Sequence, residues 1–151
     1  MPACGAEGVR GLPVPRPLDV TAIIRPTTPN TALAAPADFL PTPDVVTGPY
    51  RVPPERLYQA ILALAQAQPR VFPAAQYHDL RQVHFVARSA WLNFPDLITA
   101  AVSGPDDGPS TLVLYSRSVY GHSDLGVNRA RIDAWLPAIQ AALESPMASE
   151  R

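Results

Sequence analysis

Residues 111–132, TLVLYSRSVYGHSDLGVNRARI, contain the transition from strand to helix that decides the fold. Side chains of alternating character over 111–118 predict a strand, and helical spacing of apolar residues follows it. We expect a helix from about Gly126 to Leu143. Its predicted apolar stripe consists of Leu125, Ile132, Trp135, Leu136, Ile139 and Leu143.

The turn before this helix supplies its expected N-cap. A side-chain oxygen of Ser123 or Asp124 can accept a hydrogen bond from the free amides of the first turn. Pro137 lies on the face of the helix opposite the stripe, so the hydrogen bond that it removes would be on the solvent side. The helix can therefore bend and still cover a sheet.

Upstream residues predict one more helix and further strands. Pro53-Pro54-Glu55 opens the helix, because proline is tolerated in the first turn and an acid there faces the positive end of the dipole. Pro69 ends it. Residues 83–91 alternate strongly and predict a strand, residues 97–102 predict another, and residues 71–77 are a weak candidate that Pro73 interrupts.

The short connections between these strands favour antiparallel neighbours. We therefore predict an α+β fold: an antiparallel sheet of three to four strands with two helices packed on one face, preceded by an extended Pro-rich arm. Twelve of the 19 prolines lie in residues 1–54. The expected organisation is a disordered tail (1–17), an arm docked on the domain (18–52), a core (53–145) and a second disordered tail (146–151).

The composition excludes several partners. The net charge of −1 gives no long-range field for nucleic acid, and 7% aromatic residues are too few for a base-stacking platform. All twelve basic residues are arginine, which indicates codon bias and lowers the functional weight of any arginine cluster. No apolar run is long enough to span a bilayer. We expect no nucleic-acid partner and no transmembrane segment.

Catalytic and metal-binding motifs are absent or distorted. Gly121-His122-Ser123 has the setting of a nucleophile elbow, but Leu125 stands where the elbow needs glycine, and no histidine follows His122. The histidines at positions 78, 84 and 122 have no metal-ligand spacing, and no Gly-rich phosphate loop is present. We therefore expect no catalytic residue, no metal and no cofactor.

A set of polar residues around the strand–helix transition remains, with two interpretations. Asn128 lies four residues before Ile132, within the apolar stripe, so its amide should point into the protein. In the structural interpretation Asp124 caps the helix, Asn128 holds the loop, and Asp96 pairs with an arginine, Arg88 or Arg117. In the functional one, the set lines a shallow pocket for a small anion or a lipid head group. The candidate ligand-binding residues are Arg88, Asp96, Arg117, Ser118, Ser123, Asp124, Asn128 and Arg129.

Several of these segments resemble a known family. SRS at 116–118, Gly121, SDLGVNR at 123–129 and Arg131 are similar to the signature of domain-of-unknown-function family 1499. TPN at 28–30 is similar to the family's Ser-Pro-Asn, and RS at 88–89 followed by FPD at 94–96 to its central strand and turn. The resemblance spans about Pro26 to Leu143. It implies a small domain of bacteria and plastids, often behind a membrane anchor or signal sequence, with no established activity.

The resemblance also bears on location and function. Pro2-Ala3-Cys4-Gly5 is how a lipoprotein begins after its leader, which makes Cys4 a candidate for lipidation. We expect a non-catalytic accessory or protein-binding domain of the bacterial cell envelope, periplasmic or membrane-associated rather than cytoplasmic, with a protein partner in or at the membrane. The alternative is a binder of a small anionic or lipidic ligand at the strand–helix junction, and the third choice is a hydrolase.

Overall fold

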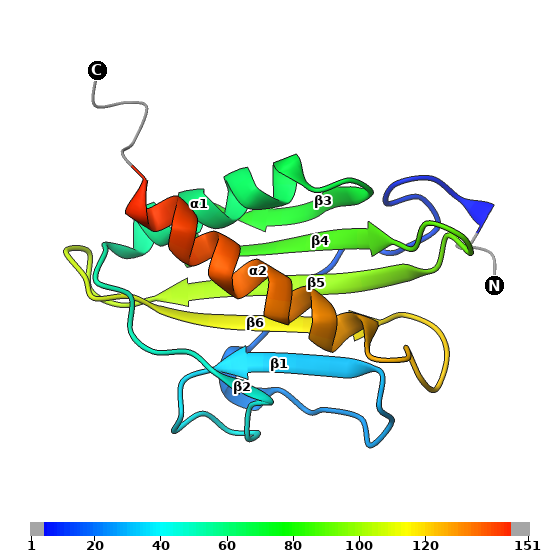
Figure 1. Ribbon diagram of the computed structural model, residues 1–151, viewed down its shortest axis with the longest axis horizontal. Helices are drawn as coiled ribbons and strands as arrows, with labels where there is room; N and C mark the ends of the chain where they lie inside the picture. The colour runs from blue at the N-terminus through cyan, green and yellow to red at the C-terminus, as the bar shows by residue number, and fades with distance from the viewer. Residues whose placement is uncertain (1–4, 146–151) are drawn as a thin grey trace.

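The computed structural model describes residues 5–145, which form one six-stranded mixed sheet and two helices (Figure 1). The strand order is β2-β1-β6-β5-β4-β3. The helices are α1 (Pro54–Ala67) and α2 (Val127–Glu144), and the strands are β1 (Thr31–Ala35), β2 (Val45–Val46), β3 (Val71–Tyr77), β4 (Gln82–Arg88), β5 (Pro95–Ser103) and β6 (Thr111–Ser118).

The predicted α+β class and the two helices are confirmed, but an antiparallel sheet of three to four strands is wrong. Two of the six strands, β1 and β2, come from the Pro-rich segment, and they pair in parallel. β1 also pairs antiparallel with β6. Its sequence, TALAA, is buried on both faces, so it lacks the polar–apolar alternation that marks a half-exposed strand.

The structure confirms the weak strand candidate at 71–77 and moves the boundary between β4 and β5. β3 is a full strand despite Pro73, because it lies at the sheet edge, where a missing amide donor is tolerated, and its register shifts between Pro73 and Ala75. β4 ends at Arg88 and β5 begins at Pro95, so the turn lies before the Phe-Pro-Asp segment and Asp96 belongs to a strand.

The N-cap of α2 lies two to three residues later than predicted. Gly126, with φ of 83°, occupies the N-cap position, while the Asp124 carboxylate accepts hydrogen bonds from the amides of Gly126 and Asn128. The predicted N-cap at Ser123 or Asp124 is therefore wrong in position, although Asp124 does satisfy the first-turn amides. Leu125 precedes the helix and is 95% exposed, whereas Ile132, Trp135 and Ile139 of the predicted stripe are buried.

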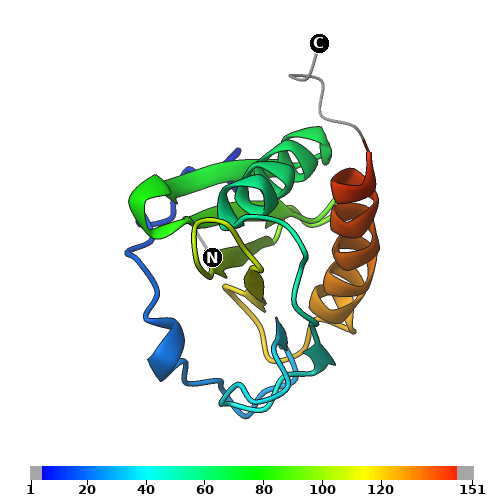
Figure 2. The same ribbon diagram turned by 90° about the vertical axis from the view of Figure 1, so that its left-hand side faces the viewer.

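Both helices cover the same face of the sheet, here called the helix face, as the sequence predicts (Figure 2). The main core lies between the two helices and the sheet. It includes Leu57, Ile61, Phe85, Ile98, Leu114, Ile132 and Trp135. A smaller cluster lies on the opposite face and includes Ile23, Leu33, Val113 and Tyr115. Among the described residues, no helix is long and apolar enough to cross a bilayer.

The N-terminal segment runs along that opposite face, here called the arm face (Figure 2). Arg88 donates to the carbonyl oxygens of Gly8 and Arg10 at one end of β4. At the other end, the Gln82 amide accepts from the Leu18 nitrogen and donates to the Leu18 oxygen. Cys4 and residues 146–151 lie outside the described residues.

His84 on the arm face predicts a pH-dependent stability. The ring is buried between Thr99 and Gln82, and burial, followed by the nearby charge of Arg117, lowers the pKa of His84 from 6.5 to about 4. Between these values the unfolded chain binds a proton that the folded chain does not, so stability rises with pH across that window. We expect His84 to contribute a slope of up to about 1.4 kcal/mol per pH unit.

Urea denaturation at pH 4 to 7 tests this slope. The difference between the wild type and His84→Gln should change across the window, because only the wild type loses stability through this ring as the pH falls. His122→Gln is the matched control, since His122 is exposed. Parallel stability curves for wild type and His84→Gln would contradict the assignment.

Candidate functional site

The polar residues around the start of α2 form a hydrogen-bonded cluster between β6 and the helix, here called the junction. Asn128 lies at its centre with a completely buried side chain. Its amide oxygen accepts from the Ser116 hydroxyl at 2.6 Å and from Arg131 at 3.0 Å. Its amide nitrogen donates to the Asn30 carbonyl oxygen, the Ser118 hydroxyl and the Asp124 carboxylate. Each polar atom of the Asn128 side chain is therefore occupied within the protein.

An ion pair closes the junction on the sheet side. Arg131 donates to the Asp96 carboxylate at 2.9 Å, and the same guanidinium donates to the Ser116 hydroxyl. The two charged side chains are only 15% and 11% exposed. Burial raises the pKa of Asp96, while the charge and the hydrogen bond of Arg131 oppose that rise. Asp96 is therefore paired, but with Arg131 and not with the expected Arg88 or Arg117.

The structure divides the eight candidate residues between four places. Four of them are joined in the junction, and Ser123 lies exposed on the loop beside it. Arg117 and Arg88 lie on the arm face, because successive strand residues point to opposite sides of the sheet. Arg129 is on the outer side of α2, in an ion pair with Asp133. The four residues in the junction are Asp96, Ser118, Asp124 and Asn128.

Three junction residues were missed as site candidates. Ser116 shares the helix face with Ser118, and Arg131 flanks the apolar stripe one turn after Asn128, so periodicity could have included both. Asn30 is 98 residues from Asn128 in sequence. Its amide donates to the Gly121 carbonyl oxygen, so it fastens the loop from β1. The signal for Asn30 was its place in the segment that resembles the family's Ser-Pro-Asn.

A pocket of 140 Å³ opens beside the junction, between the β4–β5 and β6–α2 connections. Apolar side chains, hydroxyl groups and carboxylates line it, and the lining residues are Ser89, Phe94, Asp96, Ser118, Tyr120, Gly121, Ser123, Asp124 and Val127.

The chemistry that this pocket can perform is narrow. Its serines have no histidine beside them in the lining, and the Asp96 carboxylate is held by Arg131. Burial acts to raise the pKa of Asp124, but hydrogen bonds from Asn128 and Gly126 outweigh it and lower that pKa below its ordinary value. Within residues 5–145 no group of three or more histidine, cysteine or acidic side chains could hold a metal ion. Both carboxylates of the pocket are therefore engaged by groups within the protein.

One family model matches the chain. A family model described as "Protein of unknown function (DUF1499)" matches residues 24–139, which include the whole sheet and the complete junction. No curated protein matches the chain.

Proposed function

Because the chain belongs to DUF1499, a family of proteins of unknown function, we propose its role from geometry: it is a non-catalytic protein-binding domain. The observation that supports this is an exposed apolar surface around the junction pocket. The accessory role in the bacterial cell envelope is part of the same proposal, and what supports it is the resemblance described above.

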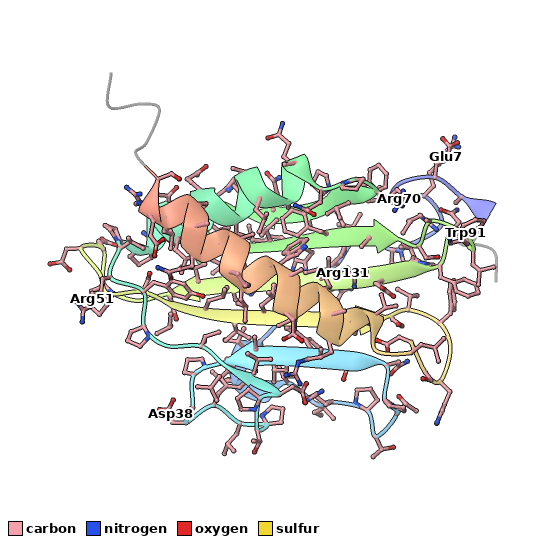
Figure 3. The ribbon with its side chains drawn as sticks, in the orientation of Figure 1. Glu7, Asp38, Arg51, Arg70, Trp91 and Arg131 are labelled. Atoms are coloured by element: carbon pink, nitrogen blue, oxygen red, sulfur yellow. The ribbon has the colours of Figure 1, made fainter. Side chains whose placement is uncertain are left out.

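Two neighbouring connections expose large apolar side chains at one end of the sheet. Trp91 is 96% exposed and lies at the tip of the molecule (Figure 3), and Leu125 is 95% exposed. Phe94 of the β4–β5 connection and Val127 at the start of α2 line the same pocket, so the two connections are adjacent. We call this set the Trp91 surface; it consists of Trp91, Leu92, Phe94, Leu125 and Val127.

Trp91 and Leu125 are almost fully exposed, so they contribute little to packing within the domain. Leu125 also adopts a φ of 56°, a conformation that leucine enters only at a cost of about 1–2 kcal/mol. Contiguous exposed apolar patches mark interaction sites on soluble domains. Burying Trp91 and Leu125 against a partner would contribute about 1.5–3 kcal/mol for each side chain.

The Trp91 surface has the composition of a protein interface. Tryptophan is enriched at the centre of such interfaces, and a polar rim surrounds the apolar centre. Here the rim is provided by Ser89, Ser123 and Asp124 at the pocket wall. The matching partner presents an apolar side chain for the pocket and hydrogen-bond donors for the rim.

The alternative function, an anion site at this junction, has less support. The pocket wall contains two carboxylates, Asp96 and Asp124, and the guanidinium next to it already pairs with Asp96. Arg117, proposed as the anion ligand, lies on the other face of the sheet. Hydrolysis is supported still less, because the pocket lining lacks a serine–histidine pair.

Site-specific photocrosslinking in cells of the source organism tests the proposal. Benzoylphenylalanine at position 91 or 125 should crosslink the same partner protein, and this partner should be recovered with the envelope fraction. Once the partner is purified, the double substitution Trp91→Ala and Leu125→Ala should weaken its binding at least tenfold.

The matched control is Leu80, an exposed leucine at the opposite end of β4. Benzoylphenylalanine at position 80 should give no crosslink to that partner, and Leu80→Ala should leave its affinity unchanged. A crosslink only to a second copy of the chain, or equal crosslinking from position 80, would remove the proposal.

A further inference from the structure

Arg117 lies on the arm face, in the middle of the sheet and away from the junction. It pairs in register with Leu97 of β5 on one side and with Thr31 of β1 on the other. Its side chain is half-buried, and burial lowers its pKa below the ordinary arginine value. A guanidinium in this position carries its charge into a partly desolvated site.

The charge of Arg117 has no carboxylate partner among residues 5–145. Its guanidinium lies over the Tyr115 ring, 4.7 Å from the ring centre, and donates one hydrogen bond to the Thr99 hydroxyl at 3.2 Å. Four of its five N–H groups therefore have no acceptor within the described chain. By contrast, Arg25, which hydrogen-bonds the neighbouring Thr31, is neutralised by Asp44 at 2.6 Å.

The contacts of Arg117 fix its orientation. Thr99 also hydrogen-bonds His84 at 2.8 Å, and His84 hydrogen-bonds Gln82 at 2.9 Å, so the acceptor for Arg117 is held by a buried chain of side chains. The contact with the Tyr115 ring holds the guanidinium on one side. A rigid planar fork with free N–H groups matches a carboxylate, which it can bind with two parallel hydrogen bonds.

An apolar cavity of 190 Å³ lies between the arm and the sheet, next to the strand segment that carries Arg117. Leu97, the cross-strand neighbour of Arg117, forms part of its wall, and so does Val119, two residues further along the chain. The arm closes the other side with Val9, Leu12 and Val14. The wall is almost entirely apolar, and such a space binds hydrocarbon in preference to water.

We propose that the arm face binds a free fatty acid, with its carboxylate on Arg117 and its acyl chain in the cavity beneath the arm. The charge selects a single anion, because Arg117 has no carboxylate partner within residues 5–145, whereas Arg25 on the same face is paired with Asp44. The apolar wall selects a hydrocarbon tail next to that anion. The site lies on the opposite side of the sheet from the junction, so it does not depend on the proposed protein-binding function.

Isothermal titration with sodium decanoate, kept below its micelle concentration, tests this site. The wild type should bind one decanoate per chain. Arg117→Gln should weaken binding at least tenfold, and Arg117→Lys should weaken it less, because lysine keeps the charge but loses the fork. Leu12→Glu, which places a charge on the arm side of the cavity without touching the sheet, should weaken binding to a similar extent.

The controls separate this site from general affinity for amphiphiles. Arg51→Gln removes an exposed arginine at the far end of the molecule (Figure 3) and should bind decanoate as the wild type does. Decanol, which has the same chain without the charge, should bind the wild type at least tenfold more weakly than decanoate. Melting curves confirm that each variant is folded before titration.

Three results would overturn the proposal: no decanoate binding at millimolar concentration, equal affinity in folded Arg117→Gln, or equal affinity for decanol. A further experiment measures binding to vesicles that contain phosphatidylglycerol. Arg117-dependent binding to vesicles without binding of free decanoate would identify the anion as a membrane head group and reject a free fatty acid.

Discussion

Replacing Arg131 with methionine is expected to lower the free energy of unfolding by about 3–5 kcal/mol, the largest effect of any single substitution proposed for the junction. The change leaves the Asp96 carboxylate buried without its cation, and it also removes a donor to Ser116 and Asn128. Methionine retains most of the apolar stem, so the loss reports the charge and not the packing. Urea denaturation at pH 7, followed by circular dichroism, measures it.

The pH dependence identifies the charge on Asp96 as the cause. Without Arg131, the remaining influence of burial raises the folded pKa of Asp96 further above the unfolded value of 3.8. A group with a raised folded pKa is protonated and harmless at low pH, and it destabilises the fold as pH rises through that pKa. The difference between wild type and Arg131→Met should therefore be smallest near pH 4 and grow towards neutral pH.

Two further variants serve as controls. Adding Asp96→Asn to Arg131→Met should restore part of the stability, because the buried charge is then absent. Arg129→Met, on the exposed side of the same helix, breaks an i,i+4 pair with Asp133 and should cost less than about 0.5 kcal/mol. If Arg131→Met costs no more than Arg129→Met, the buried pair contributes nothing and this account of the junction fails.

The second large effect is expected for Asn128→Leu, at about 3 kcal/mol. Leucine fits the apolar stripe of α2, but it leaves the Ser116 hydroxyl, the Asn30 carbonyl and the Asp124 carboxylate without their shared partner. Each buried polar group that loses its partner costs about 1–3 kcal/mol, partly offset by the added apolar burial. For a domain of this size, such a loss corresponds to about 6–12 °C in melting temperature.

Gln140→Leu is the matched control for this substitution. Gln140 is an exposed amide on the same helix whose contact is with Glu144, and its loss should shift the melting temperature by no more than 1–2 °C on the scale of about 0.5 kcal/mol for surface changes. If Asn128→Leu does not accumulate in a folded form, Ser116→Ala can be used instead. It removes the hydrogen bond from the Ser116 hydroxyl to Asn128 and should lower the free energy of unfolding by about 1 kcal/mol. An unchanged melting temperature for both Asn128→Leu and Ser116→Ala would show that the amide has no structural role.

The elements that sequence located best are those with a strong periodic signal. β6 has the predicted bounds, and α1 and α2 match within a few residues, because one face of each must be apolar to cover the sheet. β1 was missed because both of its faces are buried and four of its residues are alanine or leucine. β2, with two residues, is too short to carry any period.

For the junction, sequence indicated that Asn128 points inward, and the structure confirms it. Periodicity along β6 and α2 could have indicated Ser116 and Arg131, but no local pattern links Asn128 to Asn30, which lies 98 residues away in the chain. Asp96 has arginines close to it in the strand pattern, and only the placement of α2 over β5 and β6 brings Arg131 within reach. The exposure of Trp91 and Leu125 could not be predicted from the sequence either, because an apolar residue near the end of a strand or helix is more often buried.

The sequence by itself determined the α+β class, the two helices, the family resemblance and the inward-facing amide, since each depends on local periodicity or on a contiguous motif. Only the tertiary structure decided the mixed six-stranded sheet, the Asp96–Arg131 pair and the separation of Arg117 from the junction. The physical reason is that strand pairing and ion pairing join residues far apart in the chain. The partners of these residues depend on how the helices pack on the sheet, and no local sequence pattern predicts that packing.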